Sequence, residues 1–275
     1  MRRAAAWCLT AALLLGGLSG CGRAQQPTEV QVQGMAWSDM TPTDSVDLQY
    51  AERFSIDHYE GGYALITVAD EAGYLVVPEN APVPEGLDAG ITVLRQPLDS
   101  IYLVSSGVMD LIAALDALDN VTLSGTKQDG WYIDEAKQAM ADGKIQYAGK
   151  YSAPDYETIL ASGCDLAVEN AMIYHTPEVM EQIQRLGIPV LVDRSSYEDH
   201  PLGRMEWIKF YGALLNRQGE AQAYYDSLLT SLTPILDEAD TGKTVAFFYI
   251  TASGAVNVRK GTDYITKSIA LAGCD

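Results

Sequence analysis

The chain has 275 residues, and 37 acidic against 18 basic side chains give it a formal net charge of −19. Such an excess of negative charge repels nucleic-acid phosphates and argues against a nucleic-acid partner. Hydrophobic residues make up 48% of the sequence, which predicts a sizeable folded core and argues against a disordered chain.

The N-terminal segment has the pattern of an export signal. Two arginines at positions 2 and 3 precede an apolar run over 4–15, which is too short to span a bilayer. The tetrapeptide Leu-Ser-Gly-Cys at 18–21 resembles the lipobox of bacterial lipoproteins, in which the chain is cut before the cysteine. We therefore expect a signal peptide over 1–20 and a lipid anchor on Cys21. This anchor would hold the protein at the outer face of the bacterial cytoplasmic membrane, or facing the periplasm.

The next segments predict a tether followed by a small sheet. Residues 21–45 are rich in Gln, Thr, Pro and Asp, which is typical of a flexible tether. Strand-like runs follow at 54–57, 63–68 and 74–77. The glycine pair at 61–62 indicates a hairpin between the first two.

From residue 101 the sequence alternates between strand-like and helix-like segments. The predicted strands are 101–104, 145–148, 165–168 and 188–192, and the predicted helices are 108–118, 133–140, 154–161 and 177–186. This alternation predicts an N-terminal α/β lobe over 46–217, with a parallel sheet covered on both faces. Ligands of such sheets bind beyond the carboxyl ends of the strands, which indicates the loops after residues 104, 148, 168 and 192.

Two helices, 201–216 and 219–239, come next. The second would extend about 30 Å and has an apolar side at helical spacing, made by Tyr224, Tyr225, Leu228, Leu232 and Ile235. Pro234 is expected to bend this helix or to end its regular part. Strands at 244–250 and 256–258 and a helix over 265–271 complete the prediction.

Several segments together resemble the substrate-binding proteins of ABC importers for iron-siderophores, haem and cobalamin. They are Ile-Asp-His-Tyr-Glu-Gly-Gly-Tyr at 56–63, Asp-Tyr-Glu-Thr-Ile-Leu-Ala-Ser-Gly-Cys-Asp-Leu-Ala-Val at 155–168, His-Pro-Leu-Gly-Arg-Met-Glu-Trp-Ile-Lys at 200–209, and the short runs 262–265 and 270–273. The resemblance implies a class of α/β protein with two lobes joined by one long helix, here 218–240. Residues 241–275 would begin the second lobe, which is incomplete in this chain, so we expect the chain to be a fragment.

The resemblance also implies a function and partners. The ligand would be an iron complex (a siderophore or haem) or cobalamin, delivered to an ABC permease with its ATPase, with no catalysis and no cofactor of the protein's own. Glu157 stands at the position of the family's permease-docking glutamate, where a rim carboxylate steers docking and fixes register. An acidic residue favoured at a helix N-terminus is the plainer explanation for Glu157.

Ligand-binding candidates come from the loops beyond the predicted strands and from the start of the second lobe. They are Trp131, Tyr132, Lys150, Tyr151, Tyr174, His175 and Arg259. Flat aromatic side chains suit a macrocycle or a catecholate, and cations pair with ligand carboxylates or an anionic siderophore. His175 or a tyrosine is also a candidate axial ligand of haem iron. Each residue taken singly also fits an ordinary loop or packing position.

Other residues have structural explanations. Arg204 and Glu206 are expected to anchor the helix that begins near Pro201, with Asp199 as its N-cap. Cys164 and Cys274 are most simply small core residues, and a disulfide between them is left open.

Two further function classes are alternatives. A bare zinc or manganese binder would need several converging ligands, and the chain has only three His. An exported hydrolase would need a catalytic motif such as G-x-S-x-G or H-E-x-x-H, which the sequence lacks. An adhesive lipoprotein is a third alternative.

Overall fold

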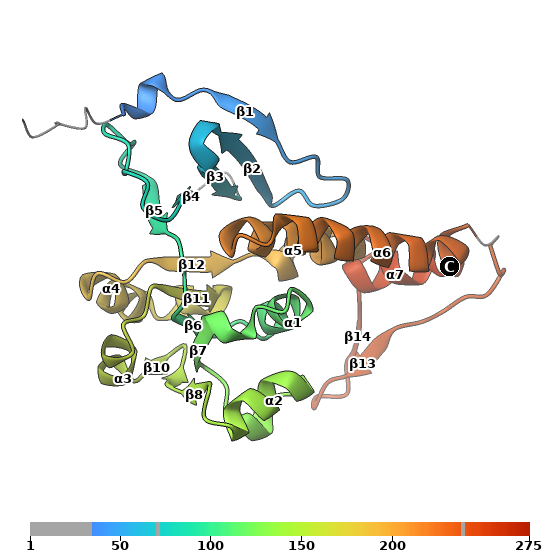
Figure 1. The fold of residues 1–275 in the computed structure, drawn as a ribbon. Helices are drawn as coiled ribbons and strands as arrows, with labels where there is room; N and C mark the ends of the chain where they lie inside the picture. The colour runs from blue at the N-terminus through green and yellow to red at the C-terminus, as the bar shows by residue number, and fades with distance from the viewer. Residues whose placement is uncertain (1–34, 70–71, 238–239) are drawn as a thin grey trace, which may run out of the picture. The chain divides into compact units, whose positions relative to one another are not determined.

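The computed structural model describes residues 35–69, 72–237 and 240–275, so the predicted signal peptide and Cys21 lie outside the described residues (Figure 1). The helices are α1 Ser106–Ala114, α2 Asp134–Ala141, α3 Tyr156–Ala161, α4 Pro177–Arg185, α5 Pro201–Leu214, α6 Gln218–Leu236 and α7 Tyr264–Leu271. The strands are β1 Pro42–Ser45, β2 Phe54–Tyr59, β3 Ala64–Val68, β4 Ala72–Val77, β5 Ile91–Arg95, β6 Ile101–Leu103, β7 Val121–Ser124, β8 Gln146–Tyr147, β9 Gly149–Lys150, β10 Ala153–Pro154, β11 Leu166–Asn170, β12 Val190–Asp193, β13 Phe248–Ile250 and β14 Val256–Val258. Across these ranges, no helix combines the length and the apolar character that crossing a bilayer requires.

The first sheet has five strands in the order β1-β2-β3-β4-β5. Strands β1 to β4 pair antiparallel and β5 runs parallel to β4. Gly61 and Gly62 adopt φ of 80° and 84° between β2 and β3, a left-handed conformation that glycine tolerates, and the predicted hairpin is confirmed. The predicted tether differs from the structure at its end. Residues 42–45 form β1 on the edge of the sheet, and the Trp37 amide donates to the Glu85 carbonyl at 2.8 Å.

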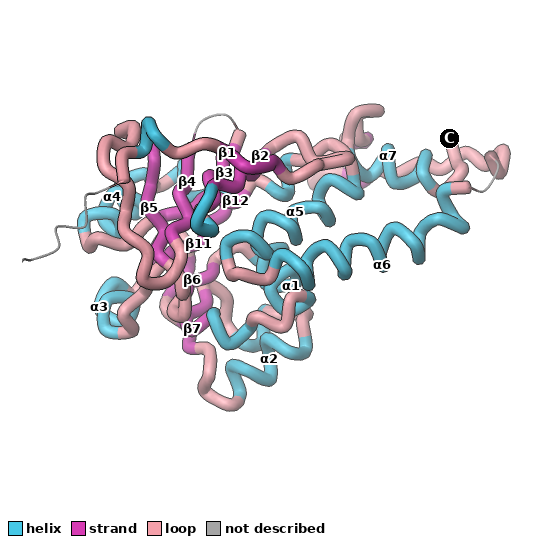
Figure 2. The backbone as a smooth tube through the Cα atoms, turned by 45° about the horizontal axis from the view of Figure 1, so that its top comes forward, coloured by secondary structure: helices cyan, strands magenta, loops and turns pink. Residues whose placement is uncertain are grey.

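The second sheet is parallel, with strand order β12-β11-β6-β7-β8. Successive side chains of β11 point to opposite faces of this sheet. Val168 lies in a core layer that contains α1 and α5, and Ala167 lies in the opposite layer, which contains α3 and α4. Figure 2 shows these helix pairs lying apart, with the sheet between them. The predicted parallel sheet with helices on both faces is confirmed.

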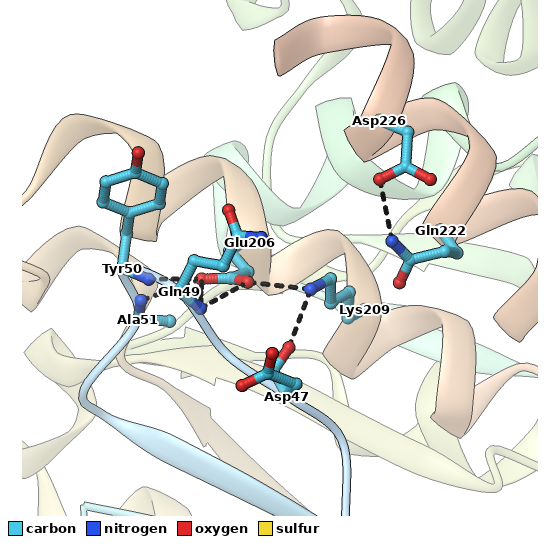
Figure 3. A network of polar contacts seen from close by, with 8 residues as sticks. All are labelled: Asp47, Gln49, Tyr50, Ala51, Glu206, Lys209, Gln222 and Asp226. Atoms are coloured by element: carbon cyan, nitrogen blue, oxygen red, sulfur yellow. Dashed lines mark hydrogen bonds and ion pairs between the residues drawn. The ribbon is translucent and has the colours of Figure 1, made fainter.

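Helix α5 lies in the core and ties the start of the described chain to the sheet. Gly203 permits a close approach, because a Cβ there would lie 2.7 Å from the Tyr50 carbonyl oxygen. Glu206 is 0% exposed and accepts hydrogen bonds from the backbone amides of residues 49–51 at 2.8–3.1 Å, and from the Lys209 ammonium at 2.8 Å (Figure 3). The anchoring role predicted for Glu206 is confirmed by these contacts. The N-cap is His200, whose Nδ1 accepts from the Leu202 amide at 3.2 Å; the prediction of Asp199 as N-cap was wrong.

Helix α6 packs beside α5 through its first half. Ala221 and Tyr225 are buried against the core, whereas Tyr224 and Ile235 on the predicted apolar side are 41% and 48% exposed. The helix ends two residues after Pro234, so the proline falls in its last turn.

Residues after α6 form the hairpin β13–β14 and helix α7. Helix α7 contacts α5, where the Arg204 guanidinium lies 3.5 Å from the centre of the Tyr264 ring. The side chains of the hairpin are exposed, with Ile250 at 66% and Val258 at 70%. Cys164 and Cys274 are free thiols and do not pair.

Candidate ligand-binding edge

The carboxyl ends of the five parallel strands meet at one edge of the second sheet, where the sequence predicts a ligand site. Exposed tyrosines and two cations, one exposed and one half-buried, lie at or beyond the ends of β7, β8, β11 and β12. We call this set the aromatic rim: Lys127, Tyr132, Tyr147, Tyr174, Arg194 and Tyr197. The tyrosines are 96%, 37%, 47% and 51% exposed in that order, so they offer apolar faces with polar tips to solvent.

Arg194 contacts two tyrosines of the rim. Its guanidinium carbon lies 4.9 Å from the centre of the Tyr174 ring and 5.2 Å from that of Tyr197, within the range of cation–π attraction. The preceding residue, Asp193, is buried and accepts from the hydroxyls of Ser195 at 2.8 Å and Tyr211 at 3.0 Å. Burial raises the pKa of Asp193 and these hydrogen bonds oppose the rise. The Asp193 contacts fix the backbone from which Arg194 extends.

The loop after β7 carries the other cation of the rim. The Lys127 ammonium lies 5.6 Å from the centre of the Tyr147 ring. Trp131 in the same loop is only 3% exposed, and its indole nitrogen donates to Ser124 Oγ at 3.2 Å. Trp131 therefore packs the loop against the core and has almost no surface for a ligand, contrary to its predicted role, while its neighbour Tyr132 faces solvent.

Lys150 and Tyr151 lie in the tight hairpin β9–β10 beyond β8. Gly149 has φ of 86°, and a Cβ on it would lie 2.8 Å from the Pro154 Cα, so glycine is required at this position. The Tyr102 hydroxyl donates to the Gly149 carbonyl at 2.8 Å and fixes the hairpin on the sheet. Lys150 is exposed, and Tyr151 is half-buried against the core layer that contains α3 and α4.

The remaining predicted residues separate into two groups. His175 is exposed beside Tyr174 in a 3-10 helix, Ala171–His175, that follows β11. Arg259 follows β14, where it pairs with Asp263 at 3.5 Å and lines a hollow against α7. Arg259 thus belongs to the C-terminal hairpin and not to the edge of the parallel sheet. The prediction missed four residues of the aromatic rim, Lys127, Tyr147, Arg194 and Tyr197, although the strand-end rule had indicated the loop after residue 192.

Glu157 lies in the first turn of α3 with its side chain exposed. The turn is fixed by Asp155, which accepts from the Thr158 amide at 3.1 Å and from the Thr158 hydroxyl at 2.7 Å. These two bonds lower the pKa of Asp155. The Glu157 carboxylate makes no hydrogen bond or ion pair with any other described residue, so it is available to a partner.

Glu169 is a further polar residue that sequence reasoning missed. It belongs to β11, is 0% exposed, and neither carboxyl oxygen has a hydrogen-bond partner among the residues with described coordinates. Burial raises its pKa from 4.5 to about 8. The same described ranges contain no group of three or more His, Cys, Asp or Glu side chains placed to hold a metal ion.

We compared the sequence and the fold with those of known proteins. No family model matches the chain. An uncharacterized lipoprotein of Methanocaldococcus jannaschii is 24% identical over 253 residues, covering 81% of this chain and 59% of that protein. The periplasmic haem-binding protein HutB of Vibrio cholerae superposes with a TM-score of 0.52 at 18% identity, covering 64% of each chain. The periplasmic catecholate-siderophore binding protein VctP of the same organism gives a TM-score of 0.52 at 14% identity, covering 66% of this chain and 62% of that one.

The chain has the fold of the periplasmic haem- and siderophore-binding proteins. The resemblance predicted from the sequence is therefore confirmed at the level of the fold. The chain spans less than two thirds of the length of these relatives, 59% of the lipoprotein and 64% and 62% of the two binding proteins.

Proposed function

We propose that the protein is an exported lipoprotein that binds an iron complex, of a siderophore or haem, or cobalamin, and delivers it to an ABC importer. The fold supports this proposal, since its relatives of known structure include a haem-binding and a catecholate-siderophore binding protein. Residues 1–20 would then be removed, and a lipid on Cys21 would hold the protein at the membrane surface.

The observation that carries the proposal is the aromatic rim at the strand ends. Exposed tyrosine rings give a flat, amphipathic surface that suits a macrocycle or an aromatic chelator. Arg194 between Tyr174 and Tyr197 places a planar cation where it can pair with a ligand carboxylate or phenolate. The overall charge of −19 makes such a local positive group more selective, because anions are repelled from most other parts of the surface.

The exposed hairpin supports a second lobe that begins near residue 241. Two isolated strands are marginally stable in water, yet Ile250, Val256 and Val258 of β13–β14 are 63–70% exposed. Further strands of a second lobe would bury these side chains and would face the rim across a cleft, with α6 as the linker. In this arrangement Arg259 would approach the ligand from the second lobe.

Glu157 is proposed as the contact of this lobe with the permease. It is exposed on the short helix α3, and the Asp155 cap fixes the turn that carries it. A carboxylate on a rigid turn fixes the register of docking to a basic surface more than it adds affinity.

The decisive experiment is a thermal-shift series on the full-length protein with a ferric catecholate siderophore, a ferric hydroxamate siderophore, haem and cobalamin. A bound ligand raises the apparent melting temperature by mass action. We expect one ligand class to raise it further with each tenfold increase in ligand concentration. Arg194→Ala should weaken the effect, while Tyr224→Ala, which removes an exposed tyrosine on α6, should not. If none of the four ligands binds, or if Arg194→Ala binds as tightly as the wild type, the proposal fails.

A further inference from the structure

Glu169 occupies an unusual place directly beneath the rim. It pairs in register with Val192 of β12, so its side chain faces the core layer that also contains Ala167 and Val104. The carboxyl group is 0% exposed, and neither oxygen has a hydrogen-bond partner within the described part of the chain. An ionised carboxylate without hydrogen-bond donors is far costlier in such a layer than the neutral acid. Burial away from any described donor therefore favours the protonated form of Glu169.

The neighbouring elements supply no cation that pairs with Glu169. The titratable side chains packed in or against this layer are Tyr102 of β6, Tyr151 of the β9–β10 hairpin, Tyr156 of α3 and Cys164. The other titratable groups on the covering elements are exposed: Lys150, Glu157, Tyr174, His175, Glu178, Glu181 and Arg185. Burial is the chief cause that raises the pKa values of the Tyr102 and Tyr156 phenols, and a negative charge on Glu169 raises them further. Tyr102 directs its hydroxyl to the Gly149 carbonyl instead of to the Glu169 carboxyl.

The segment that directly follows Glu169 carries Tyr174 of the aromatic rim. The next residue, Asn170, accepts a hydrogen bond from the Met172 amide at 2.9 Å and starts the 3-10 helix Ala171–His175. Ile173 of this helix is 0% exposed in the same core layer as Glu169, and Tyr174 beside it lies on Arg194. A charged Glu169 would need water, and admitting it requires one of the segments that cover this layer to move away from the sheet. The 3-10 helix is the covering segment that directly follows Glu169 in the chain.

We infer that Glu169 is a positioning residue whose proton keeps the 3-10 helix Ala171–His175 packed, and with it the Tyr174–Arg194 part of the rim. Loss of that proton at alkaline pH releases the segment. The consequence for ligand binding rests on the proposed function, whereas the proton-linked packing does not.

The packing is tested without any ligand, on the full-length protein. Carbon-13 NMR of the glutamate carboxyls is expected to show one group titrating near pH 8, and Glu169→Gln should remove that signal. Hydrogen exchange of the amides of residues 171–176, corrected for the intrinsic pH dependence of exchange, should become about tenfold faster between pH 7 and 9, because one pH unit above its pKa an acid is about ten to one ionised. In Glu169→Gln the exchange should stay unaccelerated, and Glu135→Gln, an exposed glutamate of α2, should behave like the wild type.

Two results would overturn the inference: a Glu169 carboxyl that titrates near 4.5, or a Glu169→Gln protein that keeps the wild-type pH dependence of exchange. A second measurement separates this inference from the proposed function. It is the affinity, as a function of pH, for the test compound that raises the melting temperature. Affinity that falls above pH 8 in the wild type but not in Glu169→Gln supports both. If no compound binds, the transport proposal fails while the exchange experiment still decides the role of Glu169.

Discussion

Replacing Glu206 with alanine should cost much more stability than replacing its partner Lys209 with methionine. The Glu206 carboxylate is 0% exposed and receives the amides of residues 49–51 together with the Lys209 ammonium. Burial opposes ionisation, but the hydrogen bonds from Lys209 and these amides outweigh it and hold the pKa of Glu206 below its usual value. The network joins segments more than 150 residues apart, since Gln49 and Glu206 are separated by 157 positions.

The magnitudes follow from which groups are left unpaired. Removing one member of a buried ion pair costs about 3–5 kcal/mol, and a buried amide that loses its acceptor adds about 1–3 kcal/mol. Only the Ala51 amide is fully buried, so Glu206→Ala should cost about 4–8 kcal/mol in total. Lys209→Met leaves the carboxylate with its three amide donors and should cost about 1–3 kcal/mol.

Urea denaturation measures these losses of unfolding free energy. The denaturation midpoints can be compared directly if the variants have the same m-value. Glu181→Ala, which removes an exposed 3.6 Å ion pair with Arg185, is the matched control and should cost less than about 1 kcal/mol. The reasoning is refuted if the Glu206 and Lys209 variants lose equal stability, because the amides would then contribute nothing beyond the ion pair.

Four other outcomes are expected. Arg194→Lys should weaken binding of the ligand identified by thermal shift about five- to tenfold in calorimetry, because an ammonium lacks the flat face that stacks between two rings. Glu157→Ala should leave that affinity unchanged and lower uptake in cells; unchanged uptake would remove the docking role. Between pH 4.5 and 8 the unfolding free energy of the wild type should fall by up to about 5 kcal/mol relative to Glu169→Gln, because the unfolded chain loses this proton near 4.5 and the folded one near 8. Gly149→Ala should lower the melting temperature, since the new Cβ would meet the Pro154 backbone at 2.8 Å.

Hydrophobic periodicity predicted most helices and strands because their apolar faces are determined locally. It missed β5 and β7: Ile91–Arg95 and Val121–Ser124 are short and lack alternation that distinguishes them from loops. It also missed β1, whose residues are all exposed and belong to the sheet through backbone pairing alone. These elements depend on partners distant in sequence, which a local pattern does not contain.

The site was predicted as a location better than as a set of side chains. The strand-end rule indicated the loops that carry the aromatic rim, and Tyr132 and Tyr174 are exposed there. It could not separate Trp131 from Tyr132, because adjacent aromatic residues in a loop carry no sign of which one the Ser124 hydroxyl will hold inside. Arg194 was overlooked since its role arises from two tyrosines that come together only in the fold.

Glu206 and Glu169 show why one buried glutamate is structural and the other invites a functional explanation. Both are 0% exposed, yet the first has four donors and a lowered pKa, and the second has no partner within the described ranges and a pKa raised to about 8. A core selected for stability alone would hold an apolar side chain at position 169, since the neutral acid gains no hydrogen bond there. Residues that break the rules of core packing without compensation concentrate at functional sites. Glu169 breaks them two strand positions beyond Ala167, where β11 ends and the 3-10 helix that carries Tyr174 begins.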